Sequence, residues 1–104
     1  MMAANKVMND ESLPFEIRRA FYYVNEDDEP EYNLWLEVAA RVLLDAIGST
    51  GLTDPSHHND AVREARNWWI IAGDDMEIVA EYCRIDLKKL KPMVLKIKPK
   101  MRKE

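Results

Sequence analysis

Residues 31–47 constrain the fold most, because they predict a helix with apolar side chains on nearly every side. Its polar exceptions, Glu37, Arg41 and Asp45, recur every four residues and therefore form one narrow stripe. A helix of this kind normally lies at the centre of a core. Glu37 and Arg41 have the order and spacing that favour an ion pair, and Gly48 is the expected end of the helix.

Shorter amphipathic stretches on both sides predict further helices. Their apolar spacing and capping residues place these helices at 14–23, 60–72, 76–83 and from 87 onward. Pro92 is expected to break or kink the last one, because proline has no amide hydrogen to donate. Beyond it, residues 94–98 alternate as a strand would. The predicted fold class is all-α, a compact bundle of about five helices.

The chain length fits one domain, since 104 residues can enclose a single core. Residues 1–11 are polar with little periodicity and predict a flexible N-terminus. We expect a single helical domain over 12–98, with Ser12 as the N-cap of its first helix. Residues 99–104 would then form a basic C-terminal tail.

Composition excludes several classes of function. A single cysteine, Cys83, permits neither an intrachain disulfide nor a cysteine-based zinc site. His57 and His58 are adjacent in a predicted loop without further ligand spacing, so no metal is expected. Neither a glycine-rich phosphate loop nor a catalytic triad pattern is visible, so we expect no cofactor and no enzyme. No apolar run has membrane-span length and no secretory signal is visible, which predicts a cytoplasmic protein.

Charge is divided unevenly along the chain. Residues 1–60 hold 12 acidic and 4 basic side chains, whereas residues 84–104 hold 9 basic and 2 acidic ones. A basic segment on an otherwise acidic protein can mark a surface that binds a polyanion. The alternative is a solvated tail that keeps the protein in solution.

Residues 78–90 resemble the helix-turn-helix of DNA-binding proteins. Ala80 is small enough for two helices to cross closely, Ile85 supplies an apolar residue in the turn, and Asp86 stands where the second helix needs an N-cap. The pattern departs from the usual one at Arg84, where the turn commonly has glycine. The bundle is therefore expected to end in a helix-turn-helix-like unit, and a plain helical hairpin is the alternative.

This resemblance implies binding to duplex DNA. The residues expected at the DNA are all basic and lie in or after the predicted unit, at Arg84, Lys88, Lys89, Lys91, Lys96, Lys98 and Lys100. Lysine suits phosphate better than base edges, which predicts modest sequence specificity and a steep salt dependence. Helix-turn-helix proteins usually bind DNA as dimers on paired half-sites, so a homodimer is expected.

Three short motifs give a broader resemblance to small, largely uncharacterised phage and prophage proteins. They are Leu44-Asp45-Ala46, Ala65-Arg66-Asn67-Trp68 and the stretch 79–90. Those proteins often have proline where this chain has Leu87. The resemblance implies a phage-type transcriptional regulator or accessory factor in the host cytoplasm, and it implies no catalytic residue.

The acidic first half suggests a function of another class. It would be a protein-interaction module that docks on a host protein and redirects or inhibits it. The contact would come from an acidic run and an exposed aromatic, namely Glu26, Asp27, Asp28, Glu29 and Trp69. Trp68 is the tryptophan expected in the core, with Trp69 at its edge.

Overall fold

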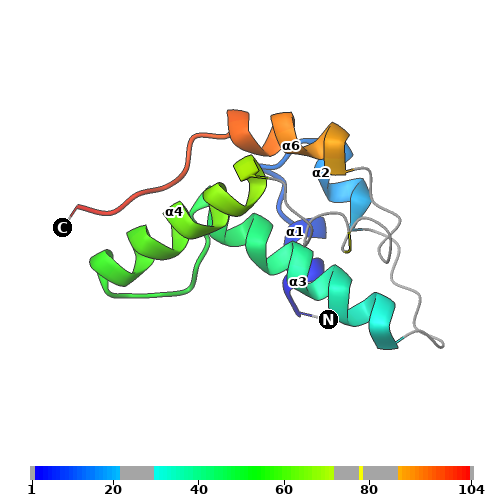
Figure 1. Ribbon diagram of the computed structural model, residues 1–104, viewed down its shortest axis with the longest axis horizontal. Helices are drawn as coiled ribbons and strands as arrows, with labels where there is room; N and C mark the ends of the chain where they lie inside the picture. The colour runs from blue at the N-terminus through cyan, green and yellow to red at the C-terminus, as the bar shows by residue number, and fades with distance from the viewer. Residues whose placement is uncertain (1, 22–29, 72–77, 79–86, 104) are drawn as a thin grey trace.

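A computed structural model of the protein describes residues 2–21, 30–71, 78 and 87–103. These residues form helices and contain no strand, which confirms the predicted all-α bundle (Figure 1). The helices are α1 (Met2–Met8), α2 (Phe15–Ala20), α3 (Pro30–Ile47), α4 (Pro55–Ile71) and α6 (Leu87–Lys96). The predicted helix-turn-helix lies mostly outside the described residues, because 79–86 are not among them.

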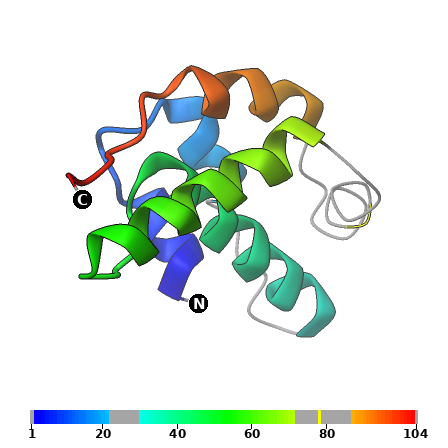
Figure 2. The same ribbon diagram turned by 60° about the vertical axis from the view of Figure 1, so that its left-hand side comes forward.

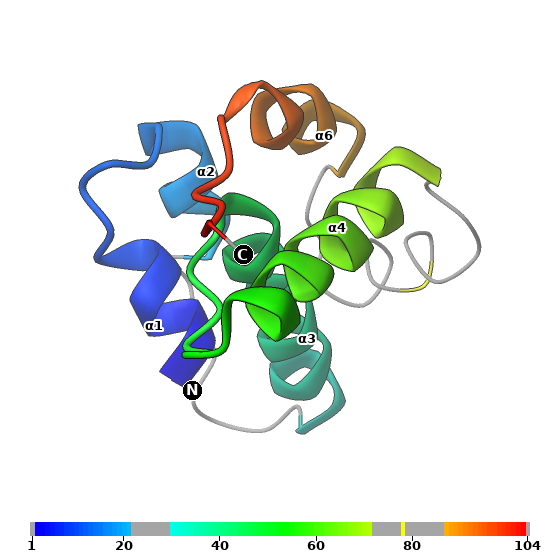
Figure 3. The same ribbon diagram turned by 90° about the vertical axis from the view of Figure 1, so that its left-hand side faces the viewer.

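Helix α3 is the centre of the core, as its apolar pattern predicts. Its buried side chains are Leu36, Ala39, Ala40, Leu43, Leu44, Ala46 and Ile47. Figure 3 shows α1 and α2 on one side of α3 and α4 on the other, and Figure 2 shows α4 crossing α3 obliquely. Each fully buried leucine contributes roughly 2 kcal/mol through the hydrophobic effect, so contacts of α3 supply much of the apolar stabilisation.

The sequence predicts no helix in the first residues, yet residues 2–8 are helical. They form α1, in which Ala3, Ala4 and Val7 are buried against α3. Glu37 of α3 stabilises this helix, because its carboxylate accepts the amide hydrogens of Ala3 and Ala4 at 2.6 and 3.2 Å. The short apolar stripe of α1 gives little periodic signal, and its cap comes from a residue more than thirty positions away.

Arg41 forms a different ion pair from the expected one. Its Nη2 lies 2.9 Å from the Asp45 carboxylate, whereas Glu37 bonds to α1. The prediction of a Glu37–Arg41 pair was therefore wrong. The physical reason is that the free amide groups at the start of α1 compete for the same carboxylate.

Helix α4 begins at Pro55, five residues before the expected start at 60. Asp54 accepts the amide hydrogen of Ser56 at 3.0 Å, and Pro55 occupies the first helical position, where a missing amide hydrogen costs nothing. His57 and His58 therefore lie in the helix and not in a loop. The buried stripe of α4 consists of His58, Asn59, Val62, Ala65 and Trp69.

Helix α6 continues through Pro92 to Lys96, so the expected break at this proline is absent, and residues 94–96 are helical. Pro92 is exposed, so its ring faces away from the core, and only the one hydrogen bond that its missing amide would make is lost. Leu90 and Val94, one turn apart, are buried in the core. Their packing holds both halves of α6 on the same surface.

The Glu37 cap can be tested by replacing Glu37 with alanine. Loss of two hydrogen bonds at the start of α1 should lower the free energy of unfolding by about 1–2 kcal/mol. Hydrogen exchange should speed up most at the α1 amides. Glu64→Ala, at an exposed site of α4, is the matched control and should change stability by less than about 0.5 kcal/mol. Equal exchange in α1 of both variants would contradict the cap.

Candidate nucleic-acid interface

Residues 97–103, which we call the C-terminal strap, leave α6 and pass beside the first turns of α4 (Figure 1). Lys100 is attached on both sides of its backbone. Its amide donates to the Ile47 carbonyl of α3 at 3.2 Å, and its carbonyl lies 2.7 Å from Nε2 of His58. The predicted basic tail is thus a segment fixed against two helices.

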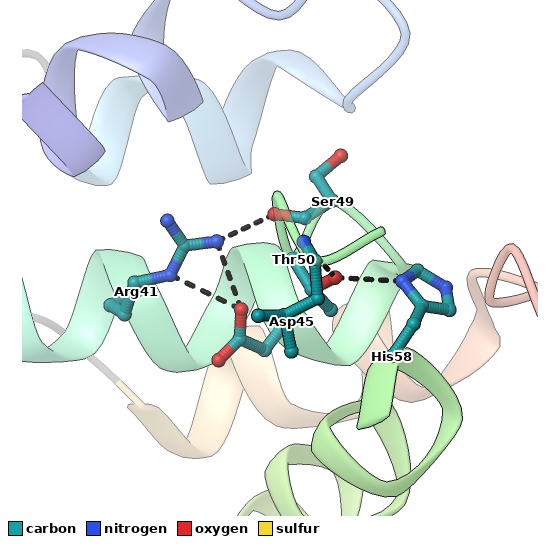
Figure 4. Close-up of polar contacts among 6 residues, drawn as sticks. Arg41, Asp45, Ser49, Thr50 and His58 are labelled. Carbon is teal, nitrogen blue, oxygen red and sulfur yellow. Dashed lines mark hydrogen bonds and ion pairs between the residues drawn. The ribbon is translucent and has the colours of Figure 1, made fainter. Parts of the chain in front are cut away.

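His58 connects the C-terminal strap to the loop between α3 and α4. The imidazole is 1% exposed, with Nδ1 2.7 Å from the Thr50 hydroxyl oxygen (Figure 4). A carbonyl can only accept, so Nε2 carries the hydrogen donated to Lys100, and in a neutral ring Nδ1 then accepts from the Thr50 hydroxyl. The hydroxyl oxygen of Thr50 also accepts the amide of Leu52 at 3.1 Å. Every polar atom of the buried ring therefore has a partner.

Asn59 makes the second attachment of the C-terminal strap. Its side-chain NH₂ donates to the Arg102 carbonyl at 2.7 Å, and its carbonyl oxygen accepts the Arg102 amide at 2.9 Å. The Asn59 side chain thus pairs with both the amide and the carbonyl of Arg102, as the backbone of a neighbouring strand would. The guanidinium of Arg102 in turn donates to the carbonyls of Leu52 and Thr53. This exposed guanidinium therefore already has partners within the protein.

Gly48 allows the C-terminal strap to approach the end of α3. Its φ is +95°, and a Cβ there would lie 2.6 Å from the backbone nitrogen and oxygen of Lys100. The Gly48 amide donates to Asp45 at 3.1 Å and the Ser49 amide to Leu44 at 2.8 Å. Two hydrogen bonds of this pattern around a left-handed glycine form a Schellman motif, which ends the helix. The expectation that Gly48 ends this helix is confirmed.

Arg66 joins the ends of α3 and α6. Nη1 donates to the carbonyls of Ala46 and Ile97 at 3.3 and 3.1 Å, and Nη2 donates to Leu95 at 2.9 Å. Helix C-termini carry partial negative charge, so a cation placed between two of them stabilises both. The arginine of the Ala-Arg-x-Trp motif is therefore a structural residue.

The predicted DNA-contacting residues differ in their surroundings. Lys96, Lys98 and Lys100 have exposed side chains, and these make no hydrogen bond or ion pair within the described ranges. Lys89 is exposed, with Nζ 4.0 Å from the Glu16 carboxylate of α2, whereas Lys91 donates to the Ile70 carbonyl of α4 at 3.0 Å. Two further predictions lie outside what the structure describes, namely Arg84 and the side chain of Lys88.

Trp69 is not the exposed contact of the alternative function. It is 0% exposed, and Trp68 is the half-buried member of the pair, with ring centroids 5.2 Å apart in an edge-to-face arrangement. Trp69 follows Val62 and Ala65 at helical spacing on the buried face of α4, so it points inward. The acidic residues Glu26, Asp27, Asp28 and Glu29 lie outside the described residues.

The described part of the chain shows neither a metal-ligand cluster nor a membrane-spanning helix. Within it, no three histidine, cysteine, aspartate or glutamate side chains gather as metal ligands. His57 points elsewhere than His58, since its Nδ1 lies 3.0 Å from Asp54 and its side chain is exposed. No described helix is long and apolar enough to cross a membrane.

Comparison with known proteins adds no homologue. No protein-family model, curated protein or solved structure matches the chain. The resemblance to phage and prophage proteins therefore stays a prediction.

Gly48→Ala should be more destabilising than Gly51→Ala. Both residues have positive φ, at +95° and +76°, but only Gly48 faces the backbone of Lys100. The strained backbone alone costs about 1–2 kcal/mol in either variant, and the clash at Gly48 adds about 1–3 kcal/mol. Urea unfolding of the two variants measures the difference. Equal losses would show that the C-terminal strap does not lie against Gly48.

Asn59→Ala should release the end of the C-terminal strap. Two hydrogen bonds worth about 0.5–1.5 kcal/mol each are lost, so trypsin should cut after Lys100 and Arg102 about tenfold faster. Asn67→Ala is the matched control because Asn67 is exposed on the same helix. Mass spectrometry of timed digests gives the rates. Unchanged cleavage in Asn59→Ala would contradict the attachment.

Proposed function

We propose that the protein binds duplex DNA through a basic surface formed by α6 and the C-terminal strap. One observation carries this proposal. Residues 87–103 contain eight basic and no acidic side chains, and their backbone is held in place by His58, Asn59 and Arg66. A charged segment that is already ordered loses less conformational entropy when it binds than a free tail does.

The exposed lysines of this surface suit phosphate contacts. Lys96, Lys98 and Lys100 occupy alternate positions, while Ile97 and Pro99 between them are partly buried. The lysines therefore project from a supported segment. An ammonium group binds phosphate as a point charge and distinguishes bases poorly. We expect affinity from counterion release and little sequence specificity from these residues.

The finer proposal is that 78–90 form a helix-turn-helix whose second helix is α6. Its support is that α6 begins at Leu87, directly after the expected N-cap Asp86. The helix runs for 10 residues, so Pro92 does not shorten it to one turn. On this proposal Lys88 and Lys89 lie in the first turn, where recognition helices contact DNA. A phage-type regulator or accessory factor acting as a homodimer in the cytoplasm is the role that follows.

A charge-reversal variant tests the interface. Fluorescence anisotropy with a duplex of about 30 base pairs, three helical turns, should show binding that weakens steeply with salt. Lys96→Glu/Lys98→Glu should lose most of the affinity. The slope of log K against log salt should fall by about 2, because two phosphate contacts are removed. A second variant, Lys88→Glu/Lys89→Glu, tests the start of α6 in the same way.

The control carries the same change in net charge on other helices. Lys6→Glu/Arg63→Glu alters exposed residues of α1 and α4, and it should retain at least half of the wild-type affinity. If the control and the test variant lost duplex affinity equally, the loss would be explained by overall charge and not by a specific interface. If the charge-reversal variants of α6 and the C-terminal strap bind the duplex as tightly as wild-type protein does, the interface is rejected.

A further inference from the structure

An open hollow of about 520 Å³ lies between α1 and α2 and has no part in the interface described so far. Its lining residues are Met8, Asn9, Phe15, Arg18 and Arg19. The volume lies within the range of pockets that hold small organic ligands. The hollow therefore combines an aromatic ring, a thioether and an amide with two guanidinium groups.

The lining offers one exposed aromatic ring and two guanidinium groups. Phe15 is 70% exposed although it is a large apolar residue. Arg18 is held at the wall, because its Nε donates to the Met8 carbonyl at 2.9 Å. Arg19 is exposed, and among the described residues it has no hydrogen bond or ion pair. Of the neighbouring carboxylates, Asp10 accepts hydrogen bonds from Ser12, Glu16 lies 4.0 Å from Lys89, and Glu11 is exposed.

The hollow adjoins the proposed DNA surface. Glu16 of α2 lies 4.0 Å from Lys89 of α6, so the helix that carries Phe15 and Arg19 touches the helix that carries the lysines. In Figure 1, α2 lies beneath the part of α6 nearest its start. The hollow therefore lies on the helix that contacts the start of α6.

We propose that this hollow binds an unpaired nucleotide of the DNA held by α6 and the C-terminal strap. The base would stack on Phe15, Arg19 would bind the adjoining phosphate, and the Asn9 amide would face the base edge. Unstacked bases bind aromatic and guanidinium planes in this way, and paired bases inside a duplex cannot enter. This inference rests on the proposed DNA binding, and it predicts a preference for duplexes with a single-stranded end.

The experiment compares a blunt duplex with the same duplex bearing a short oligothymidylate overhang. Wild-type protein should bind the overhang duplex about tenfold more tightly, the effect of stacking one base. Phe15→Ala should remove this preference without changing affinity for the blunt duplex. Phe15→Tyr should retain it, because the ring is kept. Phe15 is exposed, so circular dichroism should show both variants folded.

Two results would overturn the inference. One is wild-type protein that binds both duplexes equally, and the other is a preference that survives in Phe15→Ala. A separate arm distinguishes failure of the DNA surface itself. The Lys96→Glu/Lys98→Glu variant is titrated with free oligothymidylate, which can enter the hollow alone. If this variant binds oligothymidylate, and adding Phe15→Ala to it abolishes that binding, the hollow is supported. This conclusion holds even if duplex affinity does not depend on the C-terminal strap.

Discussion

The four carbonyls at the end of α3 must find hydrogen-bond donors, and the rest of the structure is arranged around them. A helix leaves its last four carbonyls unpaired, and leaving them buried without a donor is costly. Here Leu44 and Asp45 accept from the Ser49 and Gly48 amides, Ala46 accepts from Arg66, and Ile47 accepts from Lys100. The turn, α4 and the C-terminal strap each provide part of this set. The end of the central helix thus fixes the positions of three segments that follow it.

Several arginines of the described residues form hydrogen bonds within the protein. Arg66 and Arg102 donate to backbone carbonyls, and Arg41 donates to both Asp45 and the Ser49 carbonyl (Figure 4). A guanidinium has five hydrogens in a fixed plane, which suits several carbonyls at once. The lysines of the C-terminal strap point to solvent instead. Net charge alone therefore overstates the basic groups that can meet a ligand.

The sequence predicts the centre of the fold better than its edges. The apolar pattern of 31–47 and the glycine after it place α3 within one residue, because burial and helix termination are local properties. It does not predict α1, whose cap is supplied by Glu37 of another helix. The start of α4 had a readable signal in Asp54-Pro55, the pair that commonly opens a helix. No sequence signal indicated the roles of His58 and Asn59, since their partners in the C-terminal strap lie 42 and 43 positions away.

The long sequence separation of the C-terminal strap from His58 and Asn59 has a kinetic consequence. Contacts between distant parts of a chain pay the entropy of loop closure before they add stability. We expect α3, α4 and their shared apolar face to form first and the C-terminal strap to dock after the folding barrier. Interactions formed that late govern how fast a protein unfolds and hardly affect how fast it folds. The C-terminal strap would then set the lifetime of the native state while carrying lysines of the proposed DNA surface.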